Sequence, residues 1–153
     1  MLELDEISAL ESQGWTNGDL QPAYDALVQR WRAMQDRETG LRLLFLAWYA
    51  TAEPQDLTGL VDPDAPTVAA DVAVSLEHML SDDPEFLFVA LHMISLVPWA
   101  FDGSERTWAR RVRAYRGTAK RLGVSTLSAE SFSNRGAYGT YFAELCARLR
   151  TDE

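Results

Sequence analysis

One segment of the sequence differs in charge from the rest of the chain. Between Arg106 and Arg121 there are seven cationic side chains and no acidic one, whereas the whole chain of 153 residues has a net charge of −9. At about 100° per residue of an α-helix, six of the seven share one side. These six are Arg106, Arg110, Arg113, Arg116, Lys120 and Arg121. Such a group of cations is suited to bind phosphate, carboxylate or an acidic protein surface.

The opposite side of the same helix limits the choice of partner. Trp108, Val112 and Tyr115 recur there, so we expect their rings to point into a core rather than stack on nucleic-acid bases, with Arg111 beside them. The acidic net charge also disfavours nucleic acid and anionic membranes, because both bind through clustered cations. We therefore expect an acidic protein partner or a second copy of this chain. The alternative is a solvated face that is partly paired with the surrounding carboxylates.

A second set of residues predicts a pocket. Two segments, 41–50 and 86–97, are apolar on nearly every helical side, and four polar or aromatic residues lie in or next to them: Trp48, Tyr49, Glu53 and His92. If the segments lie side by side, these residues can line a site for a small ligand or a substrate. In the alternative interpretation, His92 is a core histidine hydrogen-bonded to a carbonyl or hydroxyl, and Glu53 accepts backbone N–H groups at a turn.

Motifs that position catalytic or metal-binding groups are missing from the sequence. There is no Gly-x-Ser-x-Gly, no Gly-x-x-x-x-Gly-Lys, no His-Glu-x-x-His and no Glu-x-x-His, and the lone Cys146 lacks a paired thiol. We expect no cofactor and no metal, and a non-enzymatic binding protein is favoured over an enzyme. The single cysteine, the acidic N-terminus and the lack of an apolar run of about 18 residues predict a cytoplasmic location.

Helical periodicity extends along the chain and predicts a single all-α domain over residues 1–153. We expect the segments 41–50 and 86–97 to be surrounded by other helices, because a helix that is apolar all round must be covered all round. Proline and glycine predict a loop over 56–66, and a Ser-rich link is predicted from Ser125 to Asn134. Amphipathic helices are predicted at about 3–12, 22–36, 64–79, 104–122 and 138–149. The inner stripe of the fourth extends to Leu122. Gly14 and Gly123 predict the ends of the first and the fourth helix, and Asp83 before Pro84 predicts the start of the helix that contains 86–97.

Similar apolar patterns return after 43–45 residues. Leu27, Trp31 and Met34 correspond to Val72, Leu76 and Met79, and Phe45 corresponds to Phe88. This interval is typical of HEAT-type repeats, in which helix pairs stack on one another. The sequence thus predicts a compact irregular bundle of about seven helices, with three stacked HEAT-like antiparallel pairs as the alternative.

Overall fold

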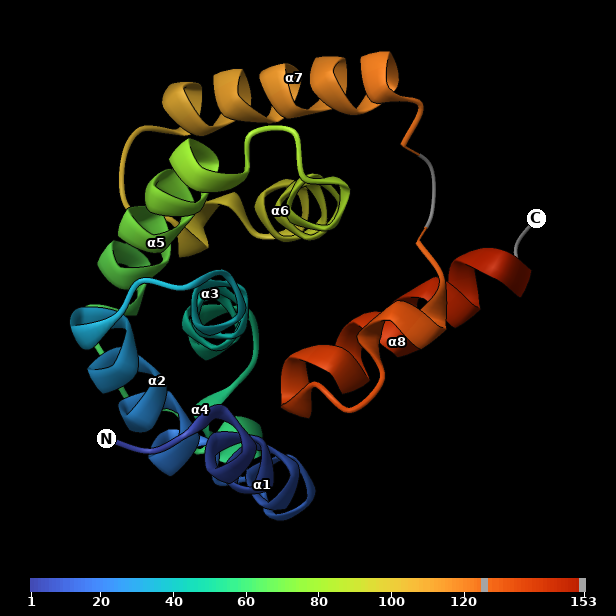
Figure 1. The fold of residues 1–153 in the computed structure, drawn as a ribbon. Coiled ribbons are helices and arrows are strands. Elements are labelled where there is room, and N and C mark those ends of the chain that lie inside the picture. The colour runs from blue at the N-terminus through green and yellow to red at the C-terminus, as the bar shows by residue number, and fades with distance from the viewer. Residues whose placement is uncertain (125–126, 152–153) are drawn as a thin grey trace.

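The computed structural model describes residues 1–124 and 127–151, and these form eight α-helices and two short 3₁₀-helices without any strand (Figure 1). The predicted all-α bundle is therefore confirmed for these residues, whereas Ser125 and Thr126 of the predicted link lie outside them. In chain order the elements are α1 (Leu4–Asn17), α2 (Gln21–Ala33), α3 (Arg37–Ala52), α4 (Gln55–Thr58), α5 (Ala65–Leu80), α6 (Pro84–Leu96), η1 (Pro98–Ala100), α7 (Glu105–Leu122), η2 (Ala129–Phe132) and α8 (Gly136–Thr151). The short α4 overlaps the predicted loop over 56–66, so the loop prediction is wrong for residues 56–58.

Helix α3 is the centre of the bundle. Every side chain of the segment 41–48 is buried, as its all-apolar pattern predicts. Helices α2 and α5 pack on α3 most extensively, and α6 and α8 approach it from other sides. Figure 1 shows α3 end-on with these helices arranged around it. The apolar area removed from water along α3 is the main source of stability for this core.

Helix α6 is less enclosed than the sequence predicts. Phe86, Val89 and Met93 are buried, but Leu96 is 56% exposed and Ser95 also lies at the surface. The expectation that the whole segment 86–97 is sealed from water is wrong for its last turn. The reason is that α7 packs along only one flank of α6, and α8 does not cover the last turn of α6 (Figure 1).

Side-chain caps set the starts of three helices. Asp36 accepts a hydrogen bond from the Thr39 N–H at the start of α3, and Asp83 accepts from two N–H groups at the start of α6. Ser104 accepts from Thr107 N–H at the start of α7. These caps satisfy N–H groups that have no partner inside the helix. The predicted starts at Pro84 and after Ser104 are thereby confirmed.

Gly14 does not end the first helix, contrary to the sequence prediction. Helix α1 continues to Asn17, and Gly18 ends it in the left-handed conformation with φ of 71°. Gly14 is needed for a different reason, because a Cβ there would lie 2.3 Å from the Asp19 carbonyl oxygen. The longer helix carries Trp15 onto Tyr49, with ring centroids 5.5 Å apart.

The HEAT-like alternative is not confirmed. Helix α3 packs most extensively on α5, and the predicted last pair does not form because α8 packs on α1, α3 and η2 (Figure 1). Met34, Met79 and Leu122, which the periodicity predicts on inner faces, are 42%, 46% and 44% exposed. Each lies at or just beyond the end of a helix, where the apolar stripe runs past its neighbour.

A pair of glycine substitutions tests the packing around α3. A Cβ at Gly40 would lie 2.7 Å from Leu76 and 2.8 Å from the Trp31 ring, whereas a Cβ at Gly117 would meet no atom within 4 Å. We expect Gly40→Ala to lower the free energy of unfolding by about 1–3 kcal/mol through overpacking. Gly117→Ala should raise it by about 1 kcal/mol, because alanine favours the helix. Urea unfolding measures both, and a Gly40→Ala variant as stable as the parent would contradict this packing.

Candidate functional site

Helix α7 presents three strips along its length. Trp108 and Tyr115 are buried and form the core strip, which packs against α5, α6 and the chain before α7. The second strip, here called the cationic face, is exposed. It consists of Arg106, Arg110, Arg113, Arg116, Lys120 and Arg121. The third strip lies between these two and turns toward α6 at Ala109 and Val112.

The cationic face is largely free of internal partners. Arg121 lies 3.9 Å from Asp82, and both side chains are about 70% exposed (69% and 71%), so solvent screens the pair. Its other five side chains make no ion pair with any residue in 1–124 or 127–151. Among residues 1–124 and 127–151, one carboxylate contacts this face, so the alternative of a solvated and only partly paired face stays open.

Arg111 is separate from the cationic face, as predicted. Its guanidinium donates a 2.7 Å hydrogen bond to Glu77 of α5 and lies 5.3 Å from the centroid of the Trp108 ring. The half-buried ion pair joins α7 to α5 and adds a cation–π contact. Arg111 has a structural role, and the free cations are those on the other side of the helix.

An open groove runs beside the cationic face, between α6, α7 and α8, and we call it the α6–α7 groove. It consists of two neighbouring hollows of about 370 and 290 Å³ that share Ser95 and Arg116. The first is lined by apolar residues and by polar and charged residues of α6, η1 and α7, and the second mainly by apolar residues of α6, α7 and α8. Arg113 and Arg116 stand along its margin. The molecule thus places free positive charge next to exposed apolar surface.

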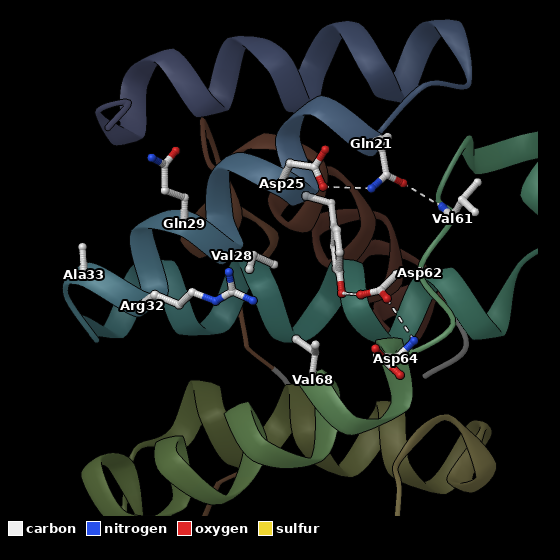
Figure 2. A pocket seen from close by; sticks show the side chains of 11 residues that line it. Gln21, Asp25, Val28, Gln29, Arg32, Ala33, Val61, Asp62, Asp64 and Val68 are labelled. Atoms are coloured by element: carbon white, nitrogen blue, oxygen red, sulfur yellow. Dashed lines mark hydrogen bonds between the residues drawn. The ribbon is translucent and has the colours of Figure 1, made fainter.

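A larger hollow of about 750 Å³ lies between α2 and the start of α5 (Figure 2). Its wall contains Tyr24, whose hydroxyl donates a 2.5 Å hydrogen bond to Asp62, and Asp62 also accepts from the Asp64 N–H. Gln21 donates to Asp25 and accepts from the Val61 N–H. Figure 2 shows these bonds along one edge of the hollow, with Arg32 on the opposite side.

These hydrogen bonds assign a structural role to the polar edge of that hollow. The Asp62 carboxylate is occupied by Tyr24 and by its own loop, and burial together with this hydrogen bond raises the pKa of the Tyr24 hydroxyl. The bonds hold the segment 61–64 against α2 and set the direction in which α5 begins. Asp25 and Asp64 remain exposed on its rim, which gives this side of the molecule an acidic character.

The residues of the predicted pocket come close together, but they pack tightly. The Trp48 indole is 2% exposed and donates to the Met93 carbonyl oxygen, and Tyr49 stacks on Phe45 at 5.0 Å. Glu53 follows the last residue of α3 as its cap. None of the five hollows described among residues 1–124 and 127–151 is lined by Trp48, Tyr49 or Glu53.

His92 bonds a hydroxyl, as its core-histidine interpretation predicts. Its Nε2 lies 2.8 Å from the Tyr141 hydroxyl, and its ring is 6.0 Å from that of Trp48. Burial lowers the pKa of the imidazole, and the positive charge of Arg148 acts in the same direction. His92 also lines the second hollow of the α6–α7 groove. The histidine thus lies between the aromatic core and the groove.

A network of ion pairs joins α1, α3, α6 and the segment just before α8 inside the bundle. Arg42, which is 4% exposed on α3, bonds Glu38 at 2.9 Å and Glu11 of α1 at 3.2 Å. Arg135 binds Glu38 with two hydrogen bonds of 2.9 and 2.6 Å, and binds Glu85 of α6 with two of 2.8 and 2.7 Å. Bidentate pairs of this kind fix both distance and orientation.

The network contains more carboxyl groups than cations. Arg37 adds bonds to Asp83, and the Tyr138 hydroxyl donates to Glu85. Three guanidinium groups thus face four carboxyl groups, the latter being Glu11, Glu38, Asp83 and Glu85. One negative charge in the network has no matching positive charge, and Glu11 is the most deeply buried of the four.

Among the four carboxyl groups, a negative charge is least stabilised on Glu11. Its side chain is fully buried, and its Oε1 has no hydrogen-bond partner among the described residues. Burial raises the pKa of the carboxyl to about 7, because the opposite charge of Arg42 only partly offsets desolvation and Glu38 adds repulsion. Gly136 makes room for this group, since a Cβ there would lie 2.3 Å from Glu11 Oε2.

The sequence patterns do not predict this network. Arg42 was included in an apolar segment, and Arg135 in a link that precedes the last helix. The available signal was a charged residue inside a segment expected to be buried, because a buried cation requires a partner. The spacing of Glu38 and Arg42 on one helix face would have identified one partner. Nothing in the local sequence points to Glu11 or Arg135.

Comparison with protein-family models, with curated proteins and with solved structures yields no match to this chain. Among residues 1–124 and 127–151, no group of three His, Cys, Asp or Glu side chains is arranged to hold a metal ion. Over the same ranges, no helix combines the length and the apolar character needed to cross a membrane. The assignment of function therefore depends on the geometry described above.

The raised pKa of Glu11 predicts a pH dependence of stability. A carboxyl whose pKa is about 7 when folded and about 4.5 when unfolded stabilises the fold fully below pH 4.5 and loses that contribution as the pH rises toward 7. We expect the parent protein to lose about 2–3 kcal/mol of stability relative to Glu11→Gln between pH 5 and pH 8. Urea unfolding at each pH measures the difference.

The comparison with the variant isolates Glu11 from other titrating groups. The lowered pKa of His92 acts in the opposite sense, since its contribution is lost as the pH falls below about 6.5, but it is common to both proteins. The exposed Glu144→Gln serves as the control and should run parallel to the parent. Parallel curves for Glu11→Gln as well would show that Glu11 does not titrate in this range.

Proposed function

We propose that this protein is a non-enzymatic binding protein that recognises an acidic polypeptide through the cationic face of α7. The observation that carries the proposal is the exposure of five cations on one helix that form no ion pair within the described residues. Like charges on one face repel one another, and an acidic partner relieves this repulsion. The polypeptide can belong to another protein or to a second copy of this chain.

Three features favour a polypeptide over nucleic acid. Trp108 and Tyr115 are 3% and 4% exposed, so the aromatic rings of α7 are not free to stack on bases. The net charge of −9 opposes approach of a polyanion as long as a duplex. Apolar surface beside Arg113 and Arg116 is, in contrast, characteristic of protein interfaces.

The alternative of a small-ligand site between α3 and α6 has less support. Trp48 and Tyr49 are engaged in aromatic packing and His92 is hydrogen-bonded to Tyr141, so a ligand would have to displace core contacts. The hollow between α2 and α5 is larger, but its polar edge serves the local loop. Among the described residues, neither is bordered by a cluster of unpaired cations such as the one on α7.

A peptide selection tests the proposed function. The probe is a display library of random 16-residue peptides, selected on the purified protein in 50 mM salt. We expect the enriched peptides to be acidic, and Arg113→Glu to weaken their binding about tenfold, because a favourable contact becomes a repulsive one. Arg32→Glu makes the same charge change on α2 and should weaken binding less than twofold.

Three outcomes would overturn the proposal. One is enrichment of neutral or basic peptides, and another is an equal effect of the two reversals. The third is tighter binding of a 20-base-pair DNA duplex than of the best peptide, with a steep loss on addition of salt, because this would identify the cationic face as a nucleic-acid site. Sedimentation of the protein alone at 20 mM and 500 mM salt shows whether the acidic partner is a second copy.

A further inference from the structure

The α6–α7 groove carries information about the shape of the partner. Its lining residues on α7 include Glu105, Ala109, Val112, Arg116 and Ala119, which recur at intervals of three or four residues. This stripe follows the helix axis for about 21 Å, at 1.5 Å per residue. The groove is therefore as long as about four turns of a second helix.

The two hollows are apolar and open. The first contains Ile94, Pro98 and Val112, and the second contains Phe88, Leu91 and Leu145. Small residues, Ser95 and Ala109, keep the space between α6 and α7 unfilled. Apolar side chains spaced along one face of a helix would fill successive hollows, as in other helix-in-groove complexes.

The positive charge at the margin of the groove indicates that the bound helix carries negative charge beside its apolar stripe. Arg113 and Arg116 line the first hollow, Arg116 also lines the second, and neither makes an ion pair with a described residue. Carboxylates that flank the apolar stripe of the occupant would reach these guanidinium groups. Glu105 lies at the η1 end of the groove and would repel a carboxylate there. We therefore expect the carboxylates of the bound helix to lie against the middle of α7.

We infer that the groove between α6, α7 and α8 binds an acidic amphipathic helix, which places its apolar side chains in the two hollows and its carboxylates against Arg113 and Arg116. This inference rests on the proposed function and adds the conformation and pattern of the partner segment. An anionic amphiphile such as a fatty acid shares the chemistry, but the open, elongated groove favours a helix over a single acyl chain, which requires an enclosed cavity.

Three synthetic peptides test the inference. All have 16 residues, and two share the same composition of leucine, glutamate and alanine. In the first peptide the leucines occupy positions 3, 7, 10 and 14, in the second they are scrambled, and in the third the first pattern is kept with glutamine in place of glutamate. We expect the first peptide to bind at least tenfold more tightly than either of the others, as measured by fluorescence anisotropy.

A matched pair of variants locates the binding. Ala109→Trp fills the first hollow and leaves every charge in place, whereas Ala114→Trp makes the same change on an exposed position of α7 outside the groove. We expect Ala109→Trp to weaken the first peptide at least tenfold and Ala114→Trp to change its affinity less than twofold. Thermal unfolding of both variants establishes that they fold.

The outcomes separate the inference from the proposed function. Equal binding of the patterned and scrambled acidic peptides, with both lost in Arg113→Glu, would overturn the inference and leave the proposed function intact. Failure of every acidic peptide to bind would overturn both. Binding of dodecanoate that Ala109→Trp abolishes, without binding of the patterned peptide, would replace the helix by an anionic amphiphile and overturn the inference.

Discussion

The structure depends on the burial of a charged residue at the centre of its core. Arg42 lies on α3, which α2, α5, α6 and α8 surround, and a guanidinium group in that position must be paired. Glu11 and Glu38 supply the partners, and Arg135 extends the pairing to Glu85. Because these partners come from different elements, their ion pairs join α1, α3, α6 and the segment just before α8. Removal of Arg42 would leave Glu11 buried without an ion-pair partner among the described residues.

This network also explains why α7 is open on one side. Arg135 and Tyr138 hold the chain before α8, and its first turn, against α3 and α6, and α8 then packs along α1 rather than along α7. An antiparallel partner for α7, which the apolar periodicity predicts, is therefore missing from the described part of the chain. The flank that such a partner would cover is the α6–α7 groove, and the cations of α7 border it. The buried ion pairs thus determine where α8 packs, and the position of α8 leaves the α6–α7 groove open.

Local features of the sequence predicted most of the helices. Asp83 before Pro84, Ser104 before α7 and Gly123 after it set helix ends through hydrogen bonds that involve only neighbouring residues, and these predictions agree with the structure. The prediction for Gly14 is wrong because a glycine can either end a helix or allow another part of the backbone to pack closely. At Gly14 the close neighbour is the Asp19 carbonyl group, a contact that the sequence does not show. The cations of α7 can be predicted because their spacing is visible within one helix. The roles of Arg42 and Arg135 cannot, because their partners are far away in the chain. Glu11 lies 31 residues from Arg42, and Glu38 lies 97 residues from Arg135.

The sequence by itself determined the helical class, the central position of α3 and the separation of α7 into apolar and cationic sides, because each follows from a repeat of 3.6 residues within one segment. Only the tertiary structure decided which helices pack together, which carboxylates surround Arg42 and where the groove opens. The physical reason is that apolar burial has no direction and accepts many arrangements of the same helices. Buried ion pairs require particular distances and orientations, and residues far apart in the chain provide them.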